Sequence, residues 1–300
     1  MKQIVIISGK GGTGKTILTG SFAALAQNKV MVDCDVDAAD LHLLLHPEIV
    51  EEHDFYSLPK AHIDEEKCTG CGECEKACHY EAVLISAAMC SKLNKSNGKN
   101  GEPCREINKI ACEGCGICAR ICPTGAICMI ENIAGKWFIS ETKYGPMVHA
   151  RLGIAEENSG KLVSLVRQQA RKIAEERSLD YVIIDGSPGI GCPVIASLTG
   201  ADLALIITEP TLSGIHDLKR VIDLTRHFNI NTACIINKHD LNKENTDNIK
   251  IWCRQNGIPI KGLIAFDQSV PESIIAGKPL VEYTDNMITE ELRKIWATLS

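Results

Sequence analysis

Short, almost wholly apolar runs alternate along the chain with segments of helical period. The apolar runs are residues 4–7, 29–32, 181–184, 203–208, 232–236 and 260–265. Runs this short and this apolar are typical of parallel strands that are buried on both faces. Between them, apolar residues recur every three or four positions, as on one face of a helix. These helical segments are 18–26, 162–174, 214–228 and 288–299. The alternation predicts an α/β fold built on a doubly wound, mostly parallel sheet.

The first strand leads directly into a glycine-rich loop. Residues 8–16 read Ser-Gly-Lys-Gly-Gly-Thr-Gly-Lys-Thr, which satisfies G-x-x-x-x-G-K-[ST]. Strand, loop and helix together are the context in which this motif binds nucleotide, because loop N–H groups and a helix N-terminus favour phosphate. The predicted nucleotide contacts in the loop are Gly9, Lys10, Gly11, Gly12, Thr13, Gly14, Lys15 and Thr16. Lys15 is expected to reach the β- and γ-phosphates, and the Thr16 hydroxyl to ligate Mg²⁺.

Fifteen cysteines is far above ordinary usage, and eight of them form two quartets of identical spacing, C-x2-C-x2-C-x3-C. The spacing is that of the bacterial ferredoxins, in which the fourth cysteine ligates the other cluster. The predicted ligands of one [4Fe-4S] cluster are therefore Cys68, Cys71, Cys74 and Cys122. Those of the second [4Fe-4S] cluster are Cys78, Cys112, Cys115 and Cys118. Two zinc sites are the alternative, although zinc ribbons usually offer cysteine pairs rather than identical quartets.

The two quartets differ in one respect, and a long stretch separates them. Pro123 follows Cys122 as the ferredoxin pattern requires, whereas His79 follows Cys78, so the backbone of the first quartet is less constrained there. Residues 82–86 and 105–110 are expected to pair as a hairpin with a polar tip. Cys90 and Cys104 flank that tip, either as a thiol pair or as small apolar fillers.

Lys10 is a second lysine in the loop that the general motif does not need. With it, the sequence K-G-G-x-G-K-T resembles the deviant Walker A loop of the MinD/ParA/Mrp ATPases and the nitrogenase iron protein. The resemblance implies that Lys10 crosses a dimer interface onto the partner's nucleotide and acts there in trans. The alternative is a solvated lysine beside the phosphates. The resemblance also implies that Asp35, which follows the second strand, orients the attacking water.

The resemblance extends to segments that follow later strands. Asp185 and Gly186 begin a stretch that looks like Walker B and switch II, which implies that Asp185 holds Mg²⁺ and that the Gly186 N–H senses the γ-phosphate. Asn237 ends another strand, where the resembled families contact adenine; a turn asparagine is the alternative. Cys192 lies just beyond switch II, as a candidate interfacial thiol that ligates or relays a cluster, or as a packed cysteine at a helix start.

Length and charge narrow the functional classes. A chain of 300 residues suits one large domain with a smaller one inserted, and a net charge of −6 argues against bulk attraction to nucleic acid or anionic lipid. Apolar runs are too short for stable membrane insertion and the N-terminus lacks a cleavage site, so a cytoplasmic location is expected. The predicted ATPase domain comprises residues 1–59 and 137–300, and the inserted α+β ferredoxin domain with two [4Fe-4S] clusters comprises residues 60–136.

The resemblance implies a Mg²⁺-dependent P-loop ATPase that cycles between ATP and ADP and is activated by dimerisation, either with itself or with a related ATPase. The favoured role is ATP-driven assembly, carriage or insertion of Fe–S or related metal clusters on a client apo-metalloprotein. An ATP-gated electron donor to a partner metalloenzyme, a redox partner in that case, is the alternative. A MinD-like spatial organiser is weaker, because the last helix lacks a basic face for lipid.

Overall fold

The computed structural model describes residues 1–86, 105–153, 156 and 159–299. The chain divides into two compact units, and each is considered by itself. The first unit comprises residues 1–53, 136–152 and 158–300, and the second comprises residues 54–135 and 153–157. The insert predicted from the sequence begins at residue 60, whereas the second unit begins at residue 54. The identity of this unit as a ferredoxin domain stays a prediction.

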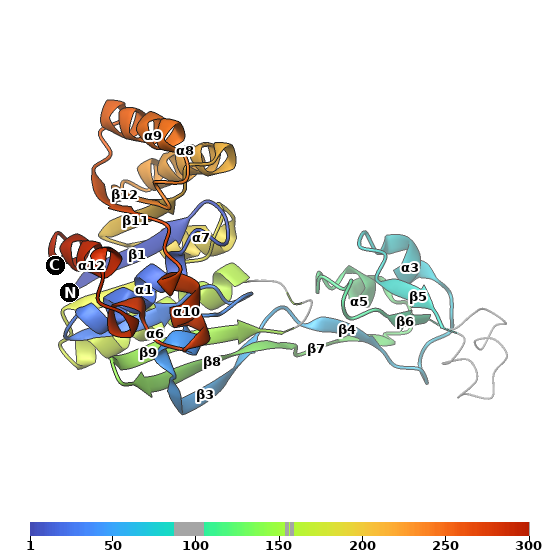
Figure 1. The fold of residues 1–300 in the computed structure, drawn as a ribbon. Helices are drawn as coiled ribbons and strands as arrows, with labels where there is room; N and C mark the ends of the chain where they lie inside the picture. Colours follow the sequence, from blue (N-terminus) through green and yellow to red (C-terminus); the bar gives the residue numbers. More distant parts are fainter. Residues whose placement is uncertain (87–104, 154–155, 157–158, 300) are drawn as a thin grey trace. The chain divides into compact units, whose positions relative to one another are not determined.

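Among the described residues, nine strands form one sheet in the order β13-β12-β11-β1-β10-β2-β9-β8-β3 (Figure 1). Seven of them run parallel, and these are β13 (Ile260–Ile264), β12 (Asn231–Asn237), β11 (Leu203–Thr208), β1 (Lys2–Ser8), β10 (Tyr181–Asp185), β2 (Lys29–Asp33) and β9 (Gly145–Leu152). The other two are β8 (Ile133–Thr142) and β3 (Glu48–Tyr56). The predicted α/β fold with a mostly parallel sheet is confirmed.

One strand of the first unit is not apparent from the sequence. The structure places β9 beside β2, with Met31 opposite Met147 and Val32 opposite Val148. Gly145, Pro146 and two later polar residues interrupt the apolar pattern, so no buried run is visible in the sequence. The neighbouring strand therefore determines this segment, more than its own composition does.

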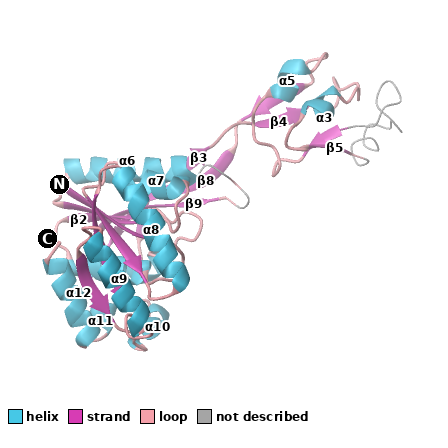
Figure 2. Ribbon diagram, turned by 90° about the horizontal axis from the view of Figure 1, so that it is seen from above, coloured by secondary structure: helices cyan, strands magenta, loops and turns pink. Residues whose placement is uncertain are grey.

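Helices cover the two faces of the sheet, with α6, α7 and α8 along one face and α11 and α12 along the other (Figure 2). The helices of the first unit are α1 (Lys15–Leu25), α2 (His42–Leu45), α6 (Ser159–Glu176), α7 (Cys192–Leu198), α8 (Leu212–His227), α9 (Lys243–Gln255), α10 (Ser269–Ile275), α11 (Leu280–Tyr283) and α12 (Met287–Ala297). Helix α1 packs against α11 and α12. None of the described helices is long and apolar enough to cross a bilayer.

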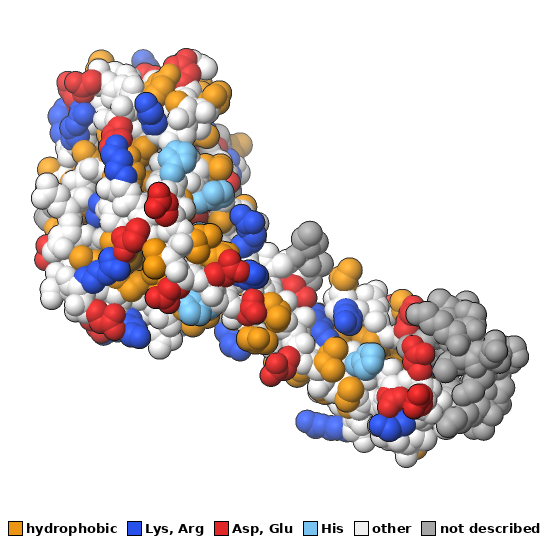
Figure 3. All heavy atoms as spheres, turned by 90° about the horizontal axis from the view of Figure 1, so that it is seen from below, with side chains coloured by type: hydrophobic (Ala, Val, Ile, Leu, Met, Phe, Trp, Pro, Cys, Tyr) orange, Lys and Arg blue, Asp and Glu red, His pale blue; other side chains and the backbone are white. Residues whose placement is uncertain are grey.

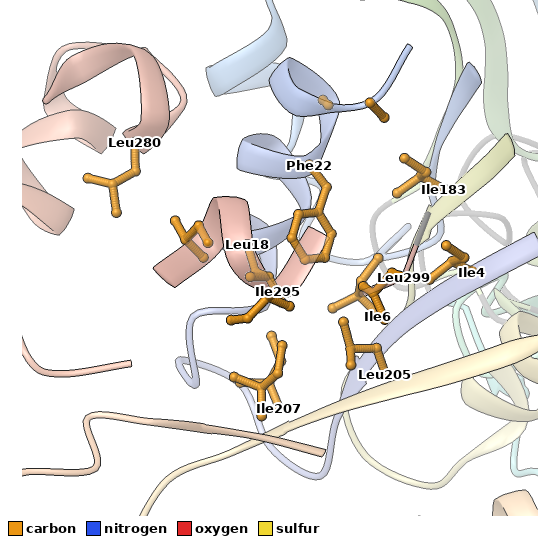
Figure 4. Close-up of a cluster of buried hydrophobic side chains, with 14 of the residues drawn as sticks. Ile4, Ile6, Leu18, Phe22, Ile183, Leu205, Ile207, Leu280, Ile295 and Leu299 are labelled. Atoms are coloured by element: carbon orange, nitrogen blue, oxygen red, sulfur yellow. The ribbon is translucent and has the colours of Figure 1, made fainter. Parts of the chain in front are cut away.

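The core beneath α1 and α12 shows why the strands are apolar throughout. Ile4 and Ile6 of β1 point toward Phe22 of α1 and Ile295 of α12 (Figure 4). Since side chains alternate along a strand, Val5 and Ile7 face the opposite layer, and they are equally buried. Both faces of β1 are thus covered, and this holds the end of the strand, where the glycine loop begins, in a fixed position.

The second unit is built from two similar halves. Strand β4 (Lys60–Ile63) pairs antiparallel with β7 (Ile127–Ile130), and β5 (Val83–Ile85) pairs antiparallel with β6 (Arg105–Ile107). Two short helices, α3 (Glu73–Ala77) and α5 (Ile117–Ile121), pack against each other. The β5–β6 pair confirms the predicted hairpin. Its tip, with Cys90 and Cys104, lies outside the described residues.

Charged side chains of both signs are interspersed on the face drawn in Figure 3, and the described side chains form no continuous basic area there. This distribution agrees with the net charge of −6. A stripe of Lys and Arg, which is the usual footprint for nucleic acid, is therefore not seen on that face.

His149 on β9 predicts a pH dependence of stability. Its ring stacks on Phe138, its Nε2 lies 2.9 Å from the Ser140 hydroxyl, and burial, with His42 and Arg151 nearby, lowers its pKa to about 4. The unfolded chain binds this proton near pH 6.5 and the folded chain only near pH 4. We therefore expect the free energy of unfolding to fall by about 3 kcal/mol as the pH drops through that window.

Urea unfolding of the intact chain at pH 7 and pH 4.5 measures this effect. His149→Gln removes the titrating group and should lose that part of the pH dependence. An identical pH dependence in both proteins would contradict the assignment.

Candidate functional site

A cavity of about 700 Å³ opens in the first unit at the carboxyl ends of β1, β2 and β12. This edge of a parallel sheet is where open α/β folds bind ligands. The predicted residues that line the cavity are Gly11, Gly12, Thr13, Gly14, Lys15, Thr16, Asp35 and Asn237. The sequence therefore located most of one wall of a nucleotide-sized site, although nucleotide contact itself stays a prediction.

The loop ends at Gly14, where the backbone is left-handed with φ 93°, and α1 begins at Lys15. A Cβ atom at Gly14 would lie 2.4 Å from the Asn237 amide nitrogen. Both the torsion and the close approach require glycine here. Lys15, Thr16 and Ile17, in the first turn of α1, line the cavity, and the N-terminus of a helix favours an anion.

Three carboxylates surround the buried ammonium group of Lys15. Its Nζ lies 2.9 Å from Asp185 Oδ1 and 3.6 Å from Asp35 Oδ2. Burial by itself lowers the pKa of Lys15, but Asp185, Asp35 and Asp33 together offset this and leave the pKa raised. Lys15 is therefore charged in this structure, and the carboxylates hold it at the cavity until a phosphate competes for it.

The surroundings of the Asp185 carboxylate fit a magnesium ion. Its Oδ1 accepts hydrogen bonds from Lys15 and from the Thr19 hydroxyl, 2.9 Å each, while Oδ2 is buried and has no hydrogen-bond partner among the described residues. A buried, unpartnered carboxylate oxygen beside a phosphate loop suits a hydrated Mg²⁺. Thr16, which lines the cavity, is the second residue that would hold the ion.

Asp33 and Thr19 belong to this group of side chains, although the sequence assigned neither a definite role. Asp33 is fully buried and accepts hydrogen bonds from the Asp35 and Leu41 N–H groups. Burial, together with the nearby charge of Asp185, raises the pKa of Asp33. Asp33 thus fixes the backbone of the segment that carries Asp35, which places the Asp35 carboxylate near Lys15.

Lys10 lies outside the cavity lining and is held by its own chain. Its Nζ is 2.5 Å from Glu209 Oε1 and 3.0 Å from the Ser213 hydroxyl. Glu209 also accepts a hydrogen bond from Lys238, at 3.2 Å. The Lys10 ammonium therefore contacts an acidic partner beside the start of α8, and its role in trans stays a prediction.

Gly186 and Gly9 make other contacts in this structure, and their predicted contacts with nucleotide stay untested. The Gly186 N–H donates to the Ile6 carbonyl at 2.8 Å, because β10 continues its pairing with β1, so this N–H does not face a phosphate in this structure. Gly9 does not line the cavity. A Cβ atom there would lie 2.3 Å from Asp217 Cβ of α8. Gly9 thus permits the close approach of α8 to the loop.

Asn237 lines the cavity, but its Nδ2 donates to the Thr13 carbonyl at 2.7 Å. Its amide therefore supports the loop in this structure, and contact with adenine is untested. The sequence missed an apolar wall beside it, formed by Phe266, Val270, Pro271 and Ile274. Phe266 is 52% exposed, so a flat base can reach its ring. The only signal was an aromatic residue just after the last strand.

All four cysteines predicted to hold the first cluster line one small cavity in the second unit. These are Cys68, Cys71, Cys74 and Cys122, and the last comes from the other quartet. The second set is also close together. Burial raises the pKa of Cys118, and the neighbouring thiols of Cys78, Cys112 and Cys115 raise it further. The crossed arrangement of ligands predicted from the spacing is thus compatible with the geometry.

The two halves repeat each other in detail. The Ala82 N–H points to Cys78 Sγ at 3.4 Å, and the Ala126 N–H points to Cys122 Sγ at 3.3 Å. The Cys78 backbone, at φ −79° and ψ 107°, resembles that of Cys122, at −65° and 115°. The backbone at Cys78 is therefore similar to that at Cys122, although proline follows only Cys122.

No group of three or more His, Cys, Asp or Glu side chains in the described residues is arranged to hold a single metal ion. In a cubane each thiolate ligates a different iron, so its four ligands stand further apart than around one ion. The residues present fit such clusters, since N–H groups are directed at two of the sulfurs and six of the eight cysteines belong to one apolar cluster. Cluster binding itself stays a prediction.

Cys192 is the first residue of α7 and is exposed. It does not line the nucleotide cavity, although its neighbour Pro193 does. Its role as an interfacial thiol is untested.

Comparison with known proteins places these sites in context. A family model described as the CobQ/CobB/MinD/ParA nucleotide binding domain matches residues 4–280. The uncharacterized protein MJ0578 of Methanocaldococcus jannaschii is 33% identical over 99% of this chain and 96% of its own length. A second uncharacterized protein of that organism, MJ0579, is 25% identical over 95% of this chain and 93% of its own length.

Solved structures show the same fold. The MinD cell division protein of Aquifex aeolicus has a TM-score of 0.55 at 19% identity, covering 100% of this chain and 97% of its own. MinD of Pyrococcus horikoshii, complexed with Mg-ADP, has a TM-score of 0.55 at 15% identity, covering 100% and 96%. At these identities the likeness concerns the fold alone.

Proposed function

Because the chain belongs to the CobQ/CobB/MinD/ParA nucleotide-binding family, we propose that it is a Mg²⁺-dependent ATPase that carries two [4Fe-4S] clusters and drives cluster assembly, carriage or insertion on a client protein. The ATPase activity is supported by the cavity that Lys15 and Thr16 line, with the buried Asp185 carboxylate 2.9 Å from the Lys15 ammonium. Cluster binding is supported by the four cysteines from both quartets that line one cavity of the second unit.

Chain connectivity suggests how ATP acts on the clusters. The segment with Asp35 follows β2, and the chain then enters the second unit within β3. Contacts of Asp35 and of the segment after Asp185 with the γ-phosphate change on hydrolysis, as in other switch regions. Dimerisation, with a second copy or with a related ATPase, would bring Lys10 of one chain to the nucleotide of the other.

A second candidate, an ATP-gated electron donor to a metalloenzyme, is favoured by the burial of the ligands. Cys74 and Cys112 are buried, and four more of the eight cysteines pack against the same apolar cluster. Ligands enclosed in this way retain a cluster, which suits electron transfer better than release. A spatial organiser, in the manner of the MinD relatives, is a third role.

One anaerobic experiment separates these roles. The full chain is loaded with iron and sulfide, and cluster transfer to an apo-ferredoxin is followed with MgATP and with MgADP. Transfer that is faster with MgATP supports cluster delivery. Retained clusters with ATP-dependent reduction of an acceptor favour the electron donor. ATP hydrolysis by a chain that binds neither iron nor sulfide would leave only the organiser role.

A further inference from the structure

The two halves of the second unit align with each other, and at one buried aligned position only one half carries a charge. The Asp64 N–H donates to the Ala126 carbonyl at 2.7 Å, and the Asn108 N–H donates to the Ala82 carbonyl at 2.8 Å. Because the two bonds join the same positions of the two halves, Asp64 corresponds to Asn108, and the first quartet corresponds to the second. Seven residues before the first cysteine of each quartet, the aligned positions are occupied by Ala61 and by Arg105. Both side chains are buried, but only one carries a charge.

Arg105 lies against the loop of the first quartet. Its Nη1 donates to the Gly70 carbonyl at 2.6 Å, and a Cβ atom at Gly72 would lie 2.7 Å from its Nη2. Its side chain lines the cavity that Cys68, Cys71, Cys74 and Cys122 surround. Among the described residues of the second unit, Arg105 is the one buried side chain that bears a charge.

Arg105 forms an ion pair with Glu75, whose carboxylate lies outside the cavity lining. The Arg105 Nε lies 2.8 Å from Glu75 Oε2, but the Glu75 side chain is 40% exposed and that of Arg105 only 10%. Solvent screens the carboxylate more than the buried guanidinium, so the pair presents its positive end to the cavity.

We propose that Arg105 makes the two cluster sites electrostatically unequal, so that the cluster held by Cys68, Cys71, Cys74 and Cys122 is reduced before the other. A cluster gains one negative charge when it accepts an electron, and a nearby cation in a medium of low dielectric constant favours that state. Ala61 gives the second site no such charge. The inference rests on the proposed cluster binding and assigns the electron to one site within it.

Redox titration of the anaerobically reconstituted full chain, followed by electron paramagnetic resonance, tests this proposal. Arg105→Gln should lower the equilibrium constant for one-electron reduction of the first cluster about tenfold, which lowers its reduction potential by about 59 mV. The potential of the second cluster should stay unchanged. Arg105→Lys should retain most of the difference. Glu75→Gln removes the opposing carboxylate and should shift the same cluster in the opposite direction.

Control variants show whether the change in reduction potential is specific to Arg105 and to the first cluster. Lys109 is an exposed cation of the same unit, and Lys109→Gln should move neither potential. Cys71→Ala should eliminate the first cluster, and with it the effect of Arg105→Gln. If Arg105→Gln fails to assemble the first cluster, Glu75→Gln decides alone.

The outcomes are distinguishable. A chain that takes up no iron and sulfide contradicts the proposed function. A chain that holds both clusters, with potentials that Arg105→Gln and Glu75→Gln leave unmoved or move equally, overturns the role of Arg105 alone.

Discussion

Replacing Lys10 with alanine should lower ATP turnover about 10³–10⁵-fold, as loss of a phosphate-directed cation does in related reactions, while ATP binding stays within a few-fold. The reason for sparing binding is structural. Lys10 contacts Glu209 and Ser213 and does not line the cavity of its own chain, where Lys15 and α1 provide the phosphate site. Calorimetry measures binding, and phosphate release measures turnover.

A mixing experiment tests whether Lys10 acts in trans. Lys15→Ala should bind ATP poorly yet still offer Lys10, whereas Lys10→Ala binds ATP but lacks the cation. Mixed dimers of these two inactive proteins should recover turnover at the sites of the Lys10→Ala chain. Full activity of Lys10→Ala by itself, or no recovery in the mixture, would contradict the role.

The second large effect concerns the crossed ligands of the clusters. Removing one cysteine from a site should cost one whole cluster, so iron content should fall from about 8 to about 4 atoms per chain. The double variant Cys71→Ala/Cys122→Ala should retain about 4 atoms, because both residues belong to one site. Cys71→Ala/Cys115→Ala, which pairs the two exposed cysteines of separate sites, should retain almost none.

Iron and sulfide analysis of purified, reconstituted chains measures this result. Cys128→Ala is the control, since Cys128 is an exposed cysteine of the same unit outside both quartets. Equal iron loss in the two double variants would mean that the ligands are not crossed as proposed.

The features that the sequence predicted well are those encoded by neighbouring residues. The loop from Gly9 to Thr16 and the buried strand before it are continuous in sequence, so their pattern is visible without the fold. The cavity at the carboxyl ends of the strands follows from the parallel sheet. Local pattern and local geometry agree in these segments, and the positions of Lys15 and Asp35 follow from them.

The features that sequence reasoning missed depend on distant partners. Glu209 holds Lys10 from 199 residues away along the chain, and β9 becomes a strand only because β2 lies beside it. The Gly186 N–H is taken by Ile6 of the neighbouring strand, a pairing no local motif reveals. Arg105 likewise reaches Gly70 from across the second unit. Periodicity carries no information about such contacts.

The measurement that tests the central claim most directly is the rate at which a chelator extracts iron from the reconstituted chain with MgATP, with MgADP and without nucleotide. Coupling of the nucleotide cycle to the clusters predicts that the MgATP rate differs several-fold from the other two, and that Lys15→Ala abolishes the difference. Equal rates under all three conditions in a chain that hydrolyses ATP would contradict the account.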